Sequence, residues 1–418
     1  MNYERPQIEM VRKRLAEAPR FMTVVSGPRQ VGKTTLVRQV LAGMPSHFVS
    51  ADEPVPSDPE DWSATPGSEP YRELPGQAPT EEWLVRHWLR ARANAARLPG
   101  NQHYVLAIDE VQKIPRWSEI VKGLWDADRA NSTRLHVILL GSSPWLMQRG
   151  LTESLAGRFE PIPLGHWSYP EMDAAFDFSL EAFVYFGGYP GCAPFVQDEP
   201  RWRTYVRGAL IDPSIERDIL QMTRVDKPAL LKALFELGCG GYSGQVISYT
   251  KLQGQLQDAG NTVTLAHYLD LLSQAGLLTG LQKYAGHKHR QRASSPKLHA
   301  QNTALVSALA GYSFTEARSD RSFWGRLVES AAGAHLINSA SADCTVHYWR
   351  ESPHEVDFVL CRGRKLLAIE IKSGPNPRPN RGLEIFATSF PGARTLTVGE
   401  GGVPLAEFLS QPADAWLE

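Results

Sequence analysis

Residues 27–34 read GPRQVGKT, which fits the pattern G-x-x-x-x-G-K-T. They follow the apolar run FMTVV at 21–25 and continue into TLVRQVL at 35–41. A glycine-rich loop between a strand and a helix binds phosphate, because its backbone N–H groups and the helix N-terminus face the anion. The stretch therefore predicts a nucleotide-binding α/β domain.

Two side chains of this Walker A loop carry specific chemistry. We expect Lys33 to contact the β- and γ-phosphates and the Thr34 hydroxyl to contact Mg²⁺. A chance match to the pattern is the alternative, and the strand before it and the helix after it make that negligible. The residues expected to bind ATP are Gly27, Pro28, Arg29, Gln30, Val31, Gly32, Lys33, Thr34 and Thr35.

Two carboxylates follow a second apolar run, YVLAI at 104–108, in the position of a Walker B element. Asp109 is predicted to hold Mg²⁺ together with Thr34, and Glu110 to orient or deprotonate the attacking water. The alternative is that the pair only caps the next helix. No Asn-Lys-x-Asp sequence is present to recognise guanine, so ATP is favoured over GTP.

Two further residues are candidates for catalysis. Ser142 follows the run at 135–140 and is expected to contact the γ-phosphate, with Ser143 as the second choice. A Gly-Ser turn that caps a helix at 144–149 is the alternative. Arg158 could reach a phosphate of its own or a neighbouring subunit, and a surface salt bridge is its alternative. The predicted catalytic residues are thus Glu110, Lys33, Ser142 and Arg158.

The composition is that of a globular protein. The chain has 418 residues, 42% of them hydrophobic and 21% charged, which predicts about three domains. The formal net charge of −1 argues neither for nor against binding to nucleic acid. The four cysteines lie far apart and are expected to be reduced thiols. The N-terminus lacks a signal sequence and no run approaches a membrane span, so a cytoplasmic protein is expected.

Apolar runs that alternate with helices predict a parallel sheet covered on both faces, here a three-layer domain at 1–170. Within it, residues 52–79 contain seven prolines and are expected to form a solvent-exposed excursion. Thr80 can cap the helix that follows.

A helical region is predicted at 171–304. Its helices at 249–259 and 263–275, followed by a strand at 277–284, are typical of a winged helix with a basic wing tip at 286–292. Such modules contact DNA or only pack against protein, and both alternatives stay open.

Residues 305–418 predict an α/β unit with a helix at 323–338 and strands at 345–350, 356–360 and 366–372, the last two joined through Gly363. The last two strands carry Asp357 and the sequence Glu370-Ile371-Lys372, a D…E-x-K pattern.

In this hairpin, Asp357 is expected opposite Glu370. The two carboxylates would hold Mg²⁺, Lys372 would stabilise charge on a scissile phosphate, and Glu329 from the preceding helix would complete the site. An exposed acid-base ladder without activity is the alternative.

Several segments together resemble the prokaryotic AAA-type ATPases of the AAA+ superfamily whose C-terminal domain has no assigned function but a restriction-endonuclease-like (PD-(D/E)XK) core. The resemblance implies an AAA-like ATPase module, then a winged helix, then a nuclease-like domain. One departure is at 295–305, where similar proteins show an aromatic pair, Asp and Gly, and this chain has Leu298-His299, Asn302 and Ala304 after Lys297. The segments are 27–35, 106–112, 140–143, 155–158, 187–190, 216–218, 355–358 and 369–372.

Two functions follow as hypotheses. The first is an Mg²⁺-dependent ATPase whose nucleotide state controls the winged-helix and nuclease-like domains as they act on DNA or RNA. The second is an ATP-dependent regulatory switch that binds protein partners and uses the nuclease-like domain as an inactive platform. Assembly into a homo-oligomer is open in both, and neither involves a membrane.

Overall fold

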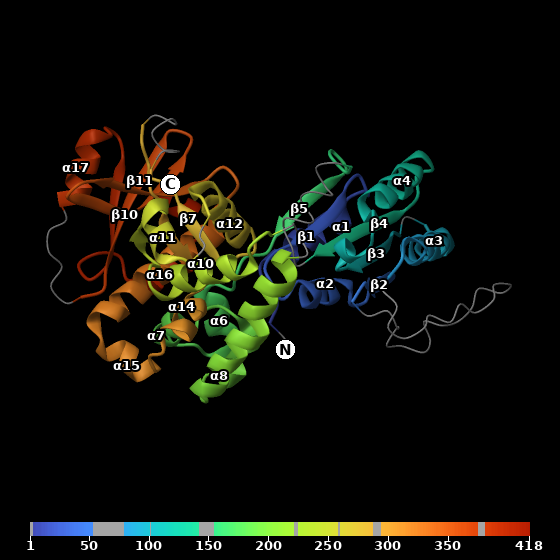
Figure 1. Ribbon diagram of the computed structural model, residues 1–418. Coiled ribbons are helices and arrows are strands. Elements are labelled where there is room, and N and C mark those ends of the chain that lie inside the picture. Colours follow the sequence, from blue (N-terminus) through green and yellow to red (C-terminus); the bar gives the residue numbers. More distant parts are fainter. Residues whose placement is uncertain are drawn as a thin grey trace. The chain divides into compact units, whose positions relative to one another are not determined.

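The computed structural model describes residues 3–52, 79–100, 102–141, 154–220, 225–257, 260–286, 294–374 and 381–418. The chain forms two compact units, residues 2–164 and residues 165–418, which are described separately (Figure 1). Division of the second unit into 171–304 and 305–418 stays a prediction. The predicted excursion, the helix at 144–149 and most of the wing tip lie outside the described residues.

The first unit contains a five-stranded parallel sheet with the order β2-β3-β4-β1-β5. Strand β1, which precedes the glycine-rich loop, pairs with β4 on one side and β5 on the other. The carboxyl ends of β1, β3 and β4 therefore meet at one edge of the sheet. The strands are β1 (Met22–Ser26), β2 (Ser46–Ser50), β3 (Tyr104–Asp109), β4 (Leu135–Gly141) and β5 (Phe159–Pro163).

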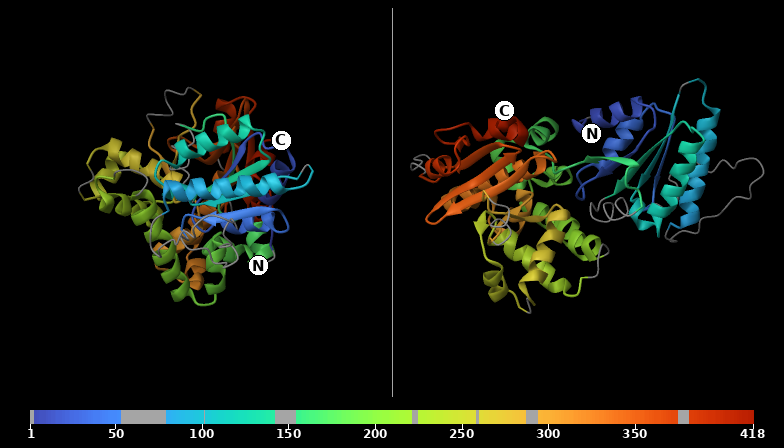
Figure 2. Two further views of the ribbon diagram at one scale, coloured as in Figure 1. Left: turned by 90° about the vertical axis from the view of Figure 1, so that its right-hand side faces the viewer. Right: turned by 90° about the horizontal axis from the view of Figure 1, so that it is seen from above.

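Helices cover both faces of this sheet, as predicted (Figure 2). Neighbouring strand residues belong to different cores: Val24 packs with α3 and α4, whereas Val25 packs with α1 and α2. This alternation follows from the two-residue period of a strand. The helices are α1 (Gln7–Ala16), α2 (Lys33–Leu41), α3 (Glu81–Arg97) and α4 (Trp117–Ala130), with a short 3-10 helix η2 (Val111–Lys113) after β3.

A buried aspartate joins α3 to α4. Asp128 is 3% exposed, and it accepts hydrogen bonds from Trp88 Nε1 and Arg92 Nε, both at 2.6 Å. A buried carboxylate is stable only when it is paired in this way. At the start of α3, the Thr80 side chain accepts from Trp83 N, which confirms the predicted N-cap.

The second unit begins with helices. They are α6 (Tyr169–Phe176), α7 (Leu180–Phe186), η3 (Pro190–Phe195), α8 (Glu199–Tyr205), η4 (Val206–Ile211), η5 (Ser214–Ile219) and α10 (Pro228–Gly240).

A small antiparallel sheet follows, with the order β6-β8-β7, together with the predicted pair of helices. Both helices begin at side-chain N-caps, Ser248 and Asn261. The elements are β6 (Gln245–Val246), α11 (Tyr249–Gln255), α12 (Thr262–Gln274), β7 (Leu278–Leu281) and β8 (Lys297–Ala300). The order of helix, turn, helix and strand is confirmed, whereas a winged helix as such stays a prediction.

The last part of the second unit is built on a four-stranded mixed sheet with the order β12-β11-β10-β9. The predicted hairpin of β10 and β11 is present, and Gly363 in its turn has a φ of 60°. Helix α17 contacts β10 and β11, and α16 contacts β11 and β8. The strands are β9 (Thr345–Glu351), β10 (His354–Arg362), β11 (Lys365–Lys372) and β12 (Arg394–Gly399). The helices are α14 (Thr303–Ala310), α15 (Phe314–Ser319), α16 (Arg321–Ser339), α17 (Arg381–Ser389), α18 (Leu405–Ser410) and η6 (Ala413–Leu417).

All four cysteines are free thiols, as expected, and three of them are buried. In the described part of the chain, no helix combines the length and the apolar character needed to cross a membrane.

Helix α16 approaches β8 and β10 closely at Gly333. A Cβ atom at this position would lie 2.3 Å from His299 Nε2 and 2.6 Å from the Phe358 ring. We expect Gly333→Ala to lower the free energy of unfolding by about 1–3 kcal/mol, the usual cost of overpacking. Urea denaturation of the full chain measures the change.

The matched control is Gly254→Ala in α11, an exposed position where an added Cβ meets nothing within 4 Å. It should raise the free energy of unfolding by about 0.5–1 kcal/mol, because alanine favours a helix over glycine. Equal effects of the two substitutions would contradict the close packing of α16.

Candidate functional site

The glycine-rich loop connects β1 to α2 and is shaped by two glycines. Gly32 precedes the helix with a φ of 89°, a conformation that favours glycine. A Cβ on Gly27 would lie 2.0 Å from the carbonyl oxygen of Leu164. The loop therefore adopts a backbone path that side chains at these two positions would block.

Two basic side chains are buried against the loop. Lys33 is 6% exposed, and its Nζ donates to the carbonyl oxygens of Gly27 at 2.9 Å and Pro28 at 2.8 Å. Arg5 is 3% exposed and donates to Val31 O at 3.0 Å. Sequence analysis gave Arg5 no role, because nothing in the local pattern connects it to a loop that starts 22 residues later.

Thr34 and Asp109, the two predicted Mg²⁺ ligands, lie together in the structure. Thr34 Oγ1 donates to Asp109 Oδ2 at 2.6 Å, and the Asp109 side chain is buried. The other carboxylate oxygen, Asp109 Oδ1, accepts from Glu110 N at 2.9 Å. A hydroxyl and a carboxylate are hard oxygen ligands, which Mg²⁺ prefers, so this pair fits the ion.

Glu110 follows β3 in the left-handed conformation, with a φ of 52°. Gln112 donates a short hydrogen bond to its carboxylate. A non-glycine residue in this conformation is strained, and such strain is frequent at functional sites. The position of Glu110 beside Asp109 agrees with the role predicted for it, which stays a prediction.

The other two predicted catalytic residues have different outcomes. Ser142 lies outside the described residues. The Arg158 carbonyl accepts from Met22 N, so Arg158 lies at the amino end of β1, whereas the loop follows its carboxyl end. Its guanidinium forms two hydrogen bonds with Asp126, at 2.7 and 3.0 Å. This salt bridge is the alternative that the sequence left open; contact with a phosphate of a neighbouring subunit stays a prediction.

In the second unit, the four residues of the predicted nuclease-like site converge. The hairpin pairs Phe358 with Ile369, the register that places Asp357 opposite Glu370. Asp357 Oδ2 accepts from Ile371 N at 2.9 Å, and Lys372 Nζ lies 2.6 Å from Glu370 Oε1. The predicted register of the hairpin is confirmed.

A fifth side chain, Lys297 from β8, lies among these carboxylates. Its Nζ is 2.7 Å from Glu329 Oε1, 3.5 Å from Glu355 Oε1 and 3.6 Å from Asp357 Oδ1, and the lysine is 1% exposed. From the sequence, Lys297 was noted in the stretch 295–305 that departs from the family pattern, and it was given no part in the nuclease-like site. Its position among the acids depends on contacts between segments far apart in the chain, which no local pattern reports.

Asn302, at the nearby departure from the family pattern, joins two segments of the second unit. Asn302 caps α14 by accepting from Ala304 N at 3.1 Å, and it also accepts from Gly188 N at 3.2 Å. A Cβ on Gly187 would lie 2.1 Å from Asn302 Oδ1, so a glycine is needed there. Asn302 therefore holds the segment at 187–190 against α14.

Residues 19–172 match the sequence model of a family described as an AAA domain. The first unit is an AAA-type P-loop domain. Residues 177–316 and 324–407 match two families described as domains of unknown function, DUF8612 and DUF4143.

The chain is 27% identical over 420 residues to uncharacterized proteins of Mycobacterium bovis and Mycobacterium tuberculosis, with 97% of this chain and 83% of each relative covered. Among solved structures, the Walker-type ATPase of Pyrococcus abyssi is 15% identical with a TM-score of 0.47, covering 74% of this chain and 96% of that one. The ORC1 protein of Aeropyrum pernix, in complex with DNA, is 14% identical with a TM-score of 0.31, covering 75% and 93%. Both TM-scores are too low to show a shared fold over the whole chain.

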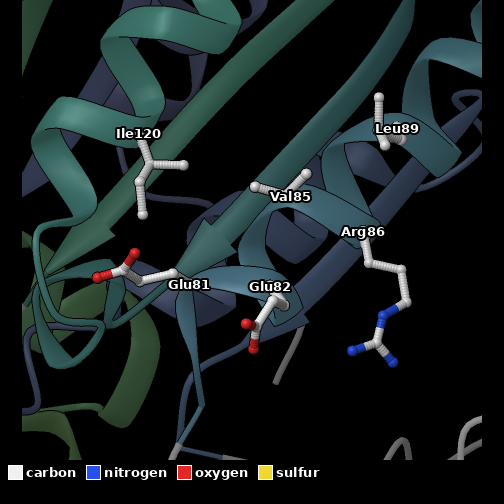
Figure 3. Close-up of a pocket in the computed structure, with 6 residues that line it drawn as sticks. All are labelled: Glu81, Glu82, Val85, Arg86, Leu89 and Ile120. Carbon is white, nitrogen blue, oxygen red and sulfur yellow. The ribbon is translucent and has the colours of Figure 1, made fainter.

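The AAA-type domain also has a pocket of about 380 Å³ beside α3, lined by Glu81, Glu82, Val85, Arg86, Leu89 and Ile120. Figure 3 shows Ile120 on the α4 side and the Arg86 guanidinium pointing away from it. None of the residues predicted to bind ATP lines this pocket.

Burial changes the acidity of the carboxylates in the second unit. It raises the pKa of Glu370 to about 7. The Asp357 charge also raises this pKa, whereas the Lys372 and Lys297 charges lower it. Burial and the Glu329 charge raise the pKa of Asp357 to about 6, although the Lys297 charge lowers it. No three His, Cys, Asp or Glu side chains of the described residues are grouped as around a metal ion.

The raised pKa of Glu370 predicts a pH-dependent loss of stability. A folded-state pKa above the ordinary 4.5 means that the folded protein binds the proton of Glu370 more tightly than the unfolded chain does. The stability that this proton adds is therefore present at low pH and is lost as the pH rises towards about 7. Glu370→Gln cannot ionise. We therefore expect its melting temperature to rise relative to that of the wild type as the pH is increased through this window.

Thermal melts of both proteins across this pH range test the prediction. The effects of other titrating groups largely cancel in the difference between the two melting temperatures. Glu384→Gln, at an exposed position of α17, is the control for replacing a carboxylate by an amide. A constant difference for Glu370→Gln would contradict the raised pKa.

Proposed function

We propose that the AAA-type domain binds ATP with Mg²⁺ and hydrolyses it. The observation that carries this proposal is the 2.6 Å hydrogen bond between Thr34 and Asp109, which joins the glycine-rich loop to the end of β3. Phosphoryl transfer depends mainly on positioning and charge neutralisation, and both need these elements at one edge of the sheet.

The proposal assigns separate roles to the loop, to the acids after β3 and to two further residues. Residues 27–35 surround the phosphates with backbone N–H groups, and Lys33 supplies positive charge to them. Thr34 and Asp109 would hold Mg²⁺, which neutralises charge on the phosphate oxygens. Glu110 orients the attacking water and accepts its proton. Ser142 and a neighbouring subunit's Arg158 are further candidates for contact with the γ-phosphate.

We further propose that the nucleotide state controls how the second unit is presented to DNA or RNA, through a winged-helix module and a nuclease-like domain. The helix pair α11 and α12 beside a three-stranded sheet supports the first module. The convergence of Glu329, Asp357, Glu370 and Lys372 supports the second.

A regulatory switch that acts on protein partners is the second candidate. One observation favours it: the Lys297 ammonium contacts two carboxylates of the predicted nuclease-like site, Glu329 and Asp357, and also the nearby Glu355. In this case the second unit is an inactive platform and carries ATP-dependent changes to a partner. A net charge of −1 is compatible with such partners.

Substitutions in the loop and after β3 test ATP hydrolysis. Lys33→Ala should abolish ATP binding, measured with a fluorescent ATP analogue. Glu110→Gln should keep ATP binding but lower the hydrolysis rate by roughly 100-fold or more, because the general base is lost. Glu119→Gln, the same change at an exposed position of α4, serves as the control. Full hydrolysis by Glu110→Gln would remove Glu110 from the mechanism.

An ATPase assay with single-stranded DNA, duplex DNA and RNA distinguishes the two candidate functions. If the second unit acts on nucleic acid, one of the three should raise the hydrolysis rate several-fold, and Lys33→Ala should abolish the effect. Cleavage is followed in the same samples with Mg²⁺, and Asp357→Asn should remove it. An ATPase that responds to none of the three would favour the switch with protein partners.

A further inference from the structure

Lys297 and three carboxylates of the second unit form an ion cluster, here called the Lys297 cluster, which comprises Lys297, Glu329, Glu355 and Asp357. Its members come from three elements: β8 supplies the lysine, α16 supplies Glu329, and β10 supplies the other two acids. The distances from Nζ to the carboxylates run from 2.7 to 3.6 Å. Nζ also lies 3.4 Å from the Asp357 carbonyl oxygen.

A lysine that is 1% exposed loses nearly all of its hydration. Such a charge is stable only when the surrounding groups replace the water, and an isolated ammonium would lose its proton instead. Here the three acids replace it, together with the face of the Phe358 ring, whose centroid lies 5.3 Å from Nζ. The cluster is therefore organised around Lys297.

The surrounding charges are nearly balanced without any added ion. Lys372 pairs with Glu370 at 2.6 Å, and Arg350 Nε lies 3.8 Å from Glu355 Oε2. With Lys297, three basic side chains thus face four carboxylates. Little negative charge is left to attract a divalent cation.

The position of Nζ also conflicts with a metal ion between Glu329 and Asp357. An Mg²⁺ ion binds carboxylate oxygens at about 2.1 Å, and Nζ lies 2.7 and 3.6 Å from an oxygen of each acid. The two cations would be within about 6 Å of each other in a site with little water, where like charges repel strongly.

We propose that Lys297 is the resident cation of this cluster and holds its carboxylates together in place of a divalent metal ion. The second unit then needs no metal to keep Glu329 and Asp357 side by side. An Mg²⁺ ion between Glu329 and Asp357 does not fit these residues as the structure arranges them, whereas the predicted site between Asp357 and Glu370 stays a prediction. The proposal concerns the second unit alone and does not depend on ATP hydrolysis by the first.

Replacing the lysine tests the proposal. Lys297→Met keeps a side chain of similar length but removes the charge, which leaves three carboxylates without their shared partner. We expect full-length Lys297→Met to melt below the wild type without nucleotide, and its melting temperature to rise by about 3 °C or more when MnCl₂ is added. The melting temperature of the wild type should rise less than this, and only as far as its ATP site binds Mn²⁺.

Lys372→Met is the matched control, because Lys372 pairs with Glu370 and not with the three acids of the cluster. It should gain no response to Mn²⁺. The ATP site is the same in all three proteins, so any contribution it makes cancels. An equal response of the wild type and Lys297→Met to Mn²⁺ would overturn the proposal, as would no response in Lys297→Met.

Direct binding keeps the proposal testable if Lys297→Met does not fold. Electron paramagnetic resonance of free Mn²⁺ measures how much of the ion full-length wild-type protein retains without nucleotide. Retention that Asp357→Asn abolishes would place a metal ion in the cluster and contradict the role of Lys297. No retention, or retention that Asp357→Asn leaves unchanged, supports it.

Discussion

A buried positive charge must be paired, and each candidate site of this protein contains a buried lysine. Lys33, 6% exposed, donates to backbone carbonyl oxygens, which orient the ammonium against the loop. Lys297, 1% exposed, contacts three carboxylates, which neutralise its charge. The lysine of the first site therefore serves to bind phosphate, whereas the lysine of the second site takes the place of a metal ion.

The order of strands decides how the first of these sites is assembled. Strand β4 lies between β1 and β3, so the loop after β1 and the acids after β3 are separated by one strand. Helix α2 begins at Lys33, and Thr34 reaches Asp109 from its first turn. Because all five strands are parallel, their carboxyl ends lie at the same edge, and the polar residues that follow them are brought together.

Local patterns predicted most of the elements that carry the sites. The strands and helices around the loop, the Thr80 cap and the hairpin of β10 and β11 all follow from apolar periodicity and turn residues. Strands β8 and β12, which each pair with the strand before them, were not predicted. The position of Arg5 against the loop was not predicted either, whereas a salt bridge of Arg158, here with Asp126, was left open as the alternative.

The amino-acid sequence by itself determined the phosphate-binding loop, the two acids after β3 and the hairpin with Asp357, Glu370 and Lys372. Each of these is a short segment whose residue types and spacing carry the chemistry. Only the tertiary structure decided that Arg158 lies at the amino end of β1, away from the phosphate-binding loop, and that Lys297 lies among the carboxylates of the second unit. Both outcomes depend on contacts between distant segments, and a charge acts on whatever lies within a few ångströms of it, regardless of separation along the chain.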